Sequence, residues 1–176
     1  MSGRLQDRVA VVTGAAAGLG KAAAIRLAKE GAAIEILDLK DGSPAAGEIR
    51  ASGGKANSIV CDCTDEAQIS KAIQEIEGRH GRVDILVNNA GILTGRKPWH
   101  TLTKEEVSRY VQVNYVGYFL VTKAMFPLIK KSKTPRIIMV ASRTYFLANP
   151  GQSVRQPVYM RAVSSPSPDS SKTRKP

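Results

Sequence analysis

Residues 9–20, VAVVTGAAAGLG, decide the fold of this chain. A run of β-branched residues leads into a glycine-rich turn, and an alanine-rich helical pattern follows. Gly14 allows a sharp turn, Gly18 lets the backbone approach a phosphate, and Gly20 lets the helix pack against the strand. Amide groups at the start of that helix can face a pyrophosphate. The stretch predicts a strand–turn–helix unit that holds a dinucleotide, and a plain tight turn is the alternative.

The chain up to residue 153 continues this alternation of strand and helix. Five short runs are almost continuously apolar, as strands covered on both faces should be: RVAVVTG (8–14), AIEILD (33–38), ANSIVCD (56–62), VDILVNN (83–89) and RIIMVAS (136–142). Helical patterns occupy the intervals, at 18–31, 43–54, 65–81 and 103–132. We therefore expect an α/β fold, a Rossmann-type doubly wound parallel sheet of about five strands with helices on both faces.

Composition narrows the class of protein. The 176 residues suffice for one domain, and a hydrophobic content of 43% is typical of a globular protein. No apolar stretch is long enough to span a bilayer. The first residues, MSGRLQDRVAVVTG, carry charges where a signal peptide would be apolar, so a cytoplasmic protein without a membrane partner is expected.

The formal net charge of +11 invites a nucleic-acid function. Residues 154–176 carry +4 of it, and the remainder is spread over helices without aromatic residues between the charges. A solvated basic surface is therefore favoured, and no nucleic-acid partner is expected. The same 154–176 segment is rich in Ser and Pro without periodicity, so we expect a disordered tail after a dinucleotide-binding domain at 1–153.

Two smaller features bear on cofactor chemistry. Asp38 ends the second predicted strand, eighteen residues past Gly20, where a carboxylate can accept hydrogen bonds from a ribose and repel a 2′-phosphate. Ala17 and Leu39 offer no cation to such a phosphate, and only Lys40 is near, so NAD is favoured over NADP; a solvated Asp is the alternative. The pair of cysteines at 61 and 63 makes no usual metal or disulfide motif and is predicted to be core thiols.

Five ordered features resemble the short-chain dehydrogenase/reductase family over residues 5–153: TGAAAGLG, CDCTD, NNAG, Asn114 in the long helix, and a strand ending in Ser142. The resemblance implies that Asp62 and Cys63 lie at an adenine ring. It also implies that Asn89, Ala90 and Gly91 line the cofactor. With the glycine-rich turn and Asp38, the expected cofactor-binding residues are Gly14, Ala17, Gly18, Leu19, Gly20, Asp38, Asp62, Cys63, Asn89, Ala90 and Gly91.

The resemblance implies hydride exchange between a nicotinamide and a small secondary alcohol or ketone. Ser142 would then hold the substrate oxygen, and Asn114 would belong to a proton relay. A turn-forming hydroxyl is the alternative for Ser142. A structural or capping amide is the alternative for Asn114, because a buried amide must be hydrogen-bonded in any case.

The family's Tyr-x-x-x-Lys pair does not follow Ser142. The Tyr position, about thirteen residues on, holds Arg155, and the nearest candidate, Tyr159, has Val163 where the Lys should be. A Tyr without that Lys titrates near pH 10 and is a poor base at neutral pH. We therefore expect a truncated or altered member with impaired activity. A non-catalytic NAD-binding or interaction protein and a non-functional product are the alternatives.

The resemblance also bears on assembly. Family members are homo-oligomers, but the helix that usually forms the interface would lie beyond residue 153. Without it, we expect an exposed apolar patch on the long helix and an open edge at RIIMVAS. The predicted patch comprises Val111, Val113, Phe119, Leu120 and Met125.

Overall fold

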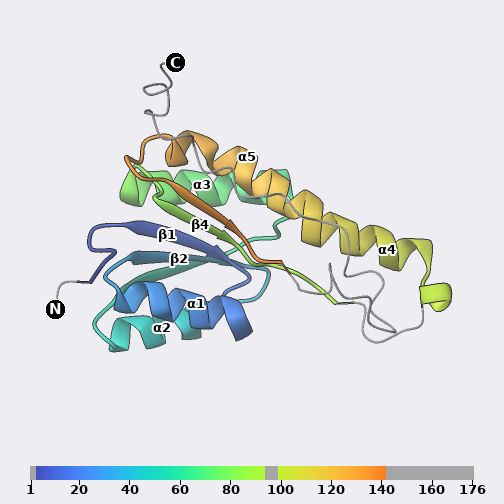
Figure 1. Ribbon diagram of the computed structural model, residues 1–176, viewed down its shortest axis with the longest axis horizontal. Coiled ribbons are helices and arrows are strands. Elements are labelled where there is room, and N and C mark those ends of the chain that lie inside the picture. Colours follow the sequence, from blue (N-terminus) through green and yellow to red (C-terminus); the bar gives the residue numbers. More distant parts are fainter. Residues whose placement is uncertain (1–2, 94–98, 142–176) are drawn as a thin grey trace, which may run out of the picture.

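The computed structural model describes residues 3–93 and 99–141, and within them the chain forms a five-stranded parallel sheet (Figure 1). The strand order is β3-β2-β1-β4-β5, and every neighbouring pair is parallel. The strands are β1 (Val9–Thr13), β2 (Ala33–Asp38), β3 (Lys55–Val60), β4 (Ile85–Asn88) and β5 (Arg136–Met139). The predicted fold class is therefore confirmed, with each strand inside or close to its apolar run.

Helices cover both faces of this sheet. In Figure 1, α1 and α2 lie below the strands, α3 and α5 lie above them, and α4 extends past their carboxyl ends. The bounds are α1 (Gly18–Lys29), α2 (Ser43–Ala51), α3 (Glu66–His80), the short 3₁₀ helix η1 (Trp99–Thr101), α4 (Lys104–Val111), the π-helix η2 (Gln112–Val116) and α5 (Gly117–Ile129). The predicted order strand, helix, strand is thus kept throughout.

The side chains of β1 alternate between two separate hydrophobic cores. Val9 and Val11 belong to the core beneath α3 and α5, whereas Ala10 and Val12 belong to the core beneath α1 and α2. Successive side chains of a strand point to opposite faces, so a strand buried on both sides must be apolar at every position. All five residues of β1 are buried; the first four are apolar, and the last, Thr13, is hydrogen-bonded to the loop after β4.

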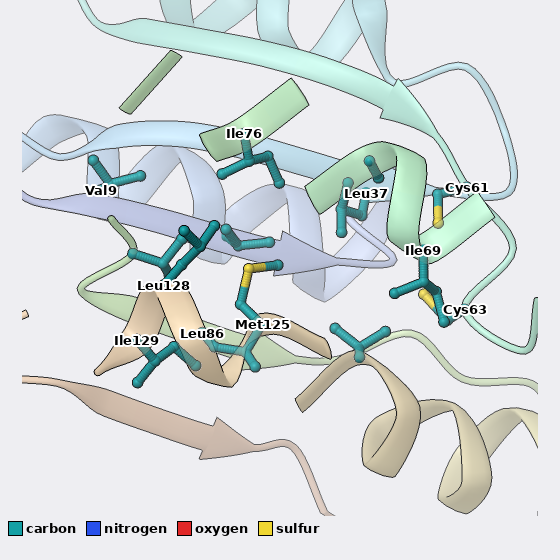
Figure 2. Close-up of a cluster of buried hydrophobic side chains, with 14 residues drawn as sticks. Val9, Leu37, Cys61, Cys63, Ile69, Ile76, Leu86, Met125, Leu128 and Ile129 are labelled. Atoms are coloured by element: carbon teal, nitrogen blue, oxygen red, sulfur yellow. The ribbon is translucent and has the colours of Figure 1, made fainter. Parts of the chain in front are cut away.

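Met125 corrects one expectation. The exposed patch predicted on the long helix included this residue, yet its side chain is fully buried (Figure 2). It lies between α5 and the sheet, in the same core as Leu86 and Ile76. Phe119 is 48% exposed, as the patch required, whereas Leu120 is partly buried against the core. The outward face of the helix is therefore narrower than the sequence suggested.

The long helix contains a π-turn that its periodicity did not reveal. Its start is as predicted, because the Thr103 hydroxyl accepts from the Glu106 amide and the Glu106 carboxylate accepts from the Thr103 amide. Nine residues after Thr103 the i→i−4 pattern gives way to a π-helix over Gln112–Val116. Such turns are often found at functional sites. Asn114 lies at the centre of this one.

Two further expectations concern membrane-spanning helices and the residues that follow position 141. Residues 3–93 and 99–141 contain no helix long and apolar enough to cross a membrane. Ser142, Tyr159 and the 154–176 tail lie outside the described residues.

Candidate cofactor site

A cavity of about 870 Å³ opens at the carboxyl ends of β1, β2 and β4. Its volume is in the range of small-molecule and cofactor sites, and its place at this edge is where ligands bind in parallel sheets. All eleven residues predicted to contact the cofactor line it: Gly14, Ala17, Gly18, Leu19, Gly20, Asp38, Asp62, Cys63, Asn89, Ala90 and Gly91. The fold thus gathers these residues from four separate stretches of sequence around one space.

The glycine-rich turn forms a cradle that a side chain would fill. Gly14 and Gly18 have φ angles of +65° and +60°, which favour glycine. A Cβ on Gly14 would lie 2.6 Å from the Ala90 Cα, and one on Gly20 would lie 2.2 Å from the Gly14 oxygen. A Cβ on Gly18 would meet nothing within 4 Å, because this position faces open space. The turn therefore fits a ligand that approaches the backbone closely at Gly18.

Thr13 joins the ends of β1 and β4 under this cradle. Its hydroxyl oxygen accepts hydrogen bonds from the amides of Asn89, at 2.9 Å, and Ala90, at 3.0 Å. The Asn89 side chain donates in turn to the carbonyl oxygens of Thr13 and Gly14, both at 3.0 Å. These bonds hold the loop after β4 against the glycine-rich turn. Asn89 thereby supports one wall of the cavity.

Backbone amides orient the Asp38 carboxylate at the cavity wall. One oxygen accepts from the Ala16 amide and the other from the Lys40 amide, each at 2.9 Å. Each carboxylate oxygen has a second lone pair, so both can still accept from ligand hydroxyls. A phosphate in the same place would meet a like charge. Lys40 lines the same cavity beside Asp38, as its position in the sequence suggested.

Asp62 and Cys63 lie across the cavity after β3. The Asp62 carboxylate accepts from the Thr64 amide at 2.8 Å and from its hydroxyl at 2.7 Å, which fixes this short loop. Burial, together with nearby carboxylates, raises the pKa of Cys61 to about 11. Burial also raises the pKa of Cys63 to about 12, with smaller contributions from Cys61 and Asp62. Both thiols are therefore neutral near pH 7.

The thiols are free and buried, as the sequence predicted for core residues. No group of three or more His, Cys, Asp or Glu residues in the described part of the chain could hold a metal ion.

Asn114 reaches back from the π-helix to the loop after β4. Its side-chain oxygen accepts from the Ile92 amide at 2.8 Å, and its side-chain nitrogen donates to the Ile92 carbonyl at 3.0 Å. Both ends of the amide are thus bonded to one residue, and Ile92 in turn lines the cavity. The arrangement makes Asn114 a brace for the cavity wall. Its role in a proton relay stays a prediction, as do the roles of Ser142 and Tyr159.

Sequence reasoning missed the contribution of the long helix to this cavity. Arg109, Gln112 and Val113 line it, at the i, i+3 and i+4 spacing that puts residues on one helix face. This spacing, next to Asn114, is the sequence pattern from which the contribution of the helix could have been predicted. The other lining residues that were not predicted are Ala16, Leu39, Lys40, Cys61, Thr64, Ile92 and Leu93.

Tyr118 is not suited to be the proton donor that the family resemblance implies. Its burial, and then the nearby Cys63 and Tyr110, raise the pKa of this phenol to about 12. Its hydroxyl donates to the Val140 carbonyl at 3.4 Å. An acid/base group works best with a pKa near the operating pH, so this tyrosine is poorly suited to the task.

Known proteins resemble this chain in sequence. A family model described as short chain dehydrogenase matches residues 8–155. Cyclopentanol dehydrogenase of Comamonas sp. (strain NCIMB 9872) is 38% identical over 151 residues, which cover 85% of this chain and 60% of that protein. Human hydroxysteroid dehydrogenase-like protein 2 is 38% identical over 150 residues, which cover 80% of this chain and 35% of that protein. The chain thus spans at most 60% of either relative.

Solved structures agree with the sequence matches. The crystal structure of an NAD⁺-bound xylitol dehydrogenase superposes with a TM-score of 0.81 at 30% sequence identity, covering 86% of this chain and 59% of that one. A short-chain dehydrogenase/reductase structure from Burkholderia xenovorans gives a TM-score of 0.80 at 32% identity, covering 87% of this chain and 64% of that one.

Proposed function

Because the chain belongs to the short chain dehydrogenase family, we propose that its cavity binds NAD for hydride exchange with a small secondary alcohol or ketone. The carrying observation is that all eleven expected cofactor residues line one cavity of about 870 Å³. The dehydrogenases and reductases among its relatives support the oxidoreductase class. An NAD⁺-bound neighbour supports the type of cofactor.

Each wall of the cavity suits a different part of a dinucleotide. The open space at Gly18 admits a pyrophosphate against the turn, and the start of α1 presents its amides there. The Asp38 carboxylate, fixed by two amides, accepts from ribose hydroxyls. Asp62 and Cys63 then lie where an adenine would bind. The nicotinamide supplies the hydride acceptor or donor when it is bound.

Asp38 is the basis for preferring NAD to NADP, since its charge opposes a 2′-phosphate. Asp38→Asn removes the charge and keeps the shape, so we expect the NADH affinity to fall about tenfold and the NADPH affinity to rise. Asp41→Asn is the matched control, because Asp41 is exposed and does not line the cavity. Titration of nicotinamide fluorescence gives both affinities. An unchanged NADH to NADPH ratio in Asp38→Asn would remove the argument for NAD.

Hydride exchange with an alcohol or ketone also needs a group that transfers a proton to or from the substrate oxygen. Asn114 braces the cavity wall, and Ser142 is the residue that we expect to hold a substrate oxygen. No Tyr in the 176 residues is followed by Lys four positions later. A Tyr is the group that would exchange a proton with that oxygen, and its Lys would lower the Tyr pKa. This observation favours a second candidate function, a non-catalytic protein that binds NAD.

Turnover separates the two candidates. The 176-residue chain is assayed for reduction of NAD with cyclopentanol, a secondary alcohol chosen because a relative is named for it. The first candidate predicts NADH formation, and the second predicts saturable NADH binding without turnover. Turnover that Asn114→Ala reduces would support the catalytic function in this chain. Absence of NADH binding by the folded chain would contradict both candidates.

A further inference from the structure

A second cavity, of about 580 Å³, lies at the amino ends of the strands, opposite the dinucleotide cavity. Val9, Ala33 and Lys55, which are the first residues of β1, β2 and β3, lie in its wall. Its volume suits a small molecule and exceeds what a single ion needs. The dinucleotide cavity is at the carboxyl ends of the same strands, so the two spaces have separate walls.

Basic side chains dominate the second cavity. Arg8, Lys55, Arg79 and Arg82 line it, and Asp7 is the one acidic residue among its described lining. Three glycines, Gly31, Gly53 and Gly54, complete the wall, so backbone is accessible there. The first cavity is lined mainly by apolar residues and glycines, with two acids and two bases. The two cavities therefore suit different ligands.

Buried carboxylates hold the three arginines of this cavity in place. Asp84 is 1% exposed and pairs with both Arg8 and Arg82, at 3.2 Å each. Glu35 is fully buried and pairs with Arg79, which also pairs with Glu75 on the outside of α3. A guanidinium has five N–H donors, and the printed bonds of the described residues use one in Arg8 and two in each of the others. Donors remain for a ligand.

Four acids, Asp7, Glu35, Glu75 and Asp84, match the four bases in number, so the site depends on where its donors lie and not on a net positive charge. Two guanidinium groups share the single Asp84 carboxylate, which lies beneath them. Lys55 makes no ion pair with any described residue. Asp84 and Glu35 are buried beneath the bases, so an entering ligand meets guanidinium N–H groups and the Lys55 ammonium, with Asp7 as the one exposed acid among the described residues of the wall. Planar guanidinium groups bind phosphate and carboxylate groups through paired hydrogen bonds.

We propose that this cavity binds a small polyanion, a molecule with two or more phosphoryl or carboxylate groups. The site is independent of the dinucleotide cavity and of the proposed NAD function. Tripolyphosphate and citrate, titrated at constant ionic strength, are the probes that separate a phosphoryl ligand from a carboxylate one. Glycine amide signals in ¹H–¹⁵N spectra locate the binding, since glycines line both cavities.

We expect saturable shifts of the Gly31, Gly53 and Gly54 amides with one common midpoint for at least one probe. Lys55→Gln should raise that midpoint roughly fivefold, because it removes one charge from the wall. Lys123→Gln is the matched control: Lys123 is exposed on α5, lines neither cavity, and its loss changes the net charge equally. Its midpoint should stay that of the wild type.

Three results would overturn the proposal. One is the absence of saturable shifts at these glycines with both probes. Another is shifts confined to Gly14, Gly18 and Gly20, which would place the anion in the dinucleotide cavity. The third is an equal effect of the two lysine variants, which would show diffuse attraction to a basic protein. NADH binding is read separately, so its failure leaves this test intact.

Discussion

At the scale of single residues, backbone amides and side-chain amides fix the cavity wall more than ion pairs do. Asp38 and Asp62 each accept from main-chain nitrogens, and Asn114 is bonded twice to Ile92. Such bonds have little freedom, so the groups that would contact a ligand are held before it arrives. Preorganisation of this kind lowers the ordering cost of binding.

Asn114→Ala tests the brace. It leaves the Ile92 amide and carbonyl without their partner, so the free energy of unfolding should fall by about 1–3 kcal/mol. Gln112→Ala is the control, because Gln112 lies in the same π-helix with an exposed side chain. Chemical denaturation measures both. Equal losses of unfolding free energy in the two variants would show that the Asn114–Ile92 hydrogen bonds do not stabilise the fold.

Asp84 predicts a pH dependence of stability. Burial raises its pKa, but hydrogen bonds from Ser132, Val9 and Arg8 outweigh this, so the pKa of Asp84 lies below its usual range. A carboxylate with a lowered folded pKa stabilises fully above its unfolded pKa, and this contribution is lost as the pH falls through the folded pKa. Asp84→Asn should therefore flatten the acid limb of unfolding free energy against pH. An unchanged limb would contradict the assignment.

At the scale of elements, two helical glycines should respond oppositely to alanine. A Cβ on Gly78 in α3 meets nothing within 4 Å, so Gly78→Ala should raise the free energy of unfolding by about 0.5–1 kcal/mol. A Cβ on the buried Gly117, at the start of α5, would lie 3.2 Å from the Cys63 carbonyl oxygen. Gly117→Ala should lower the free energy of unfolding by about 1 kcal/mol or more. Thermal and chemical unfolding give both signs, and a stabilising Gly117→Ala would show that the loop yields freely.

The same elements show how far sequence reasoning reaches. The strands were predictable because short, mostly apolar runs mark them, and β1, β2 and β4 are buried along most of their length. The outer strands β3 and β5 are partly exposed, although their runs read the same way in the sequence. The capping box at Thr103 was predictable because it depends on residues three apart. The π-helix was not, since it goes with contacts between Asn114 and Ile92 and between Gly117 and Cys63 that are distant in sequence. The burial of Met125 was missed for the same reason.

At the scale of the whole molecule, two cavities of different chemistry lie at the two ends of the parallel strands. The glycine-rich turn and three carboxyl strand ends form one, and basic residues at three amino strand ends form the other. Parallel strands make this possible, because all their carboxyl ends meet at the same edge. We propose that the first cavity admits a dinucleotide at Gly18.

The most direct test compares NADH binding by the wild type, Gly18→Ala and Gly81→Ala. Gly18 and Gly81 have φ angles of +60° and +69°, and a Cβ on either meets nothing within 4 Å, so the backbone strain is matched. Only Gly18 lines the cavity. The account predicts NADH binding at least about tenfold weaker in Gly18→Ala and unchanged in Gly81→Ala. Equal affinity in all three proteins would contradict it.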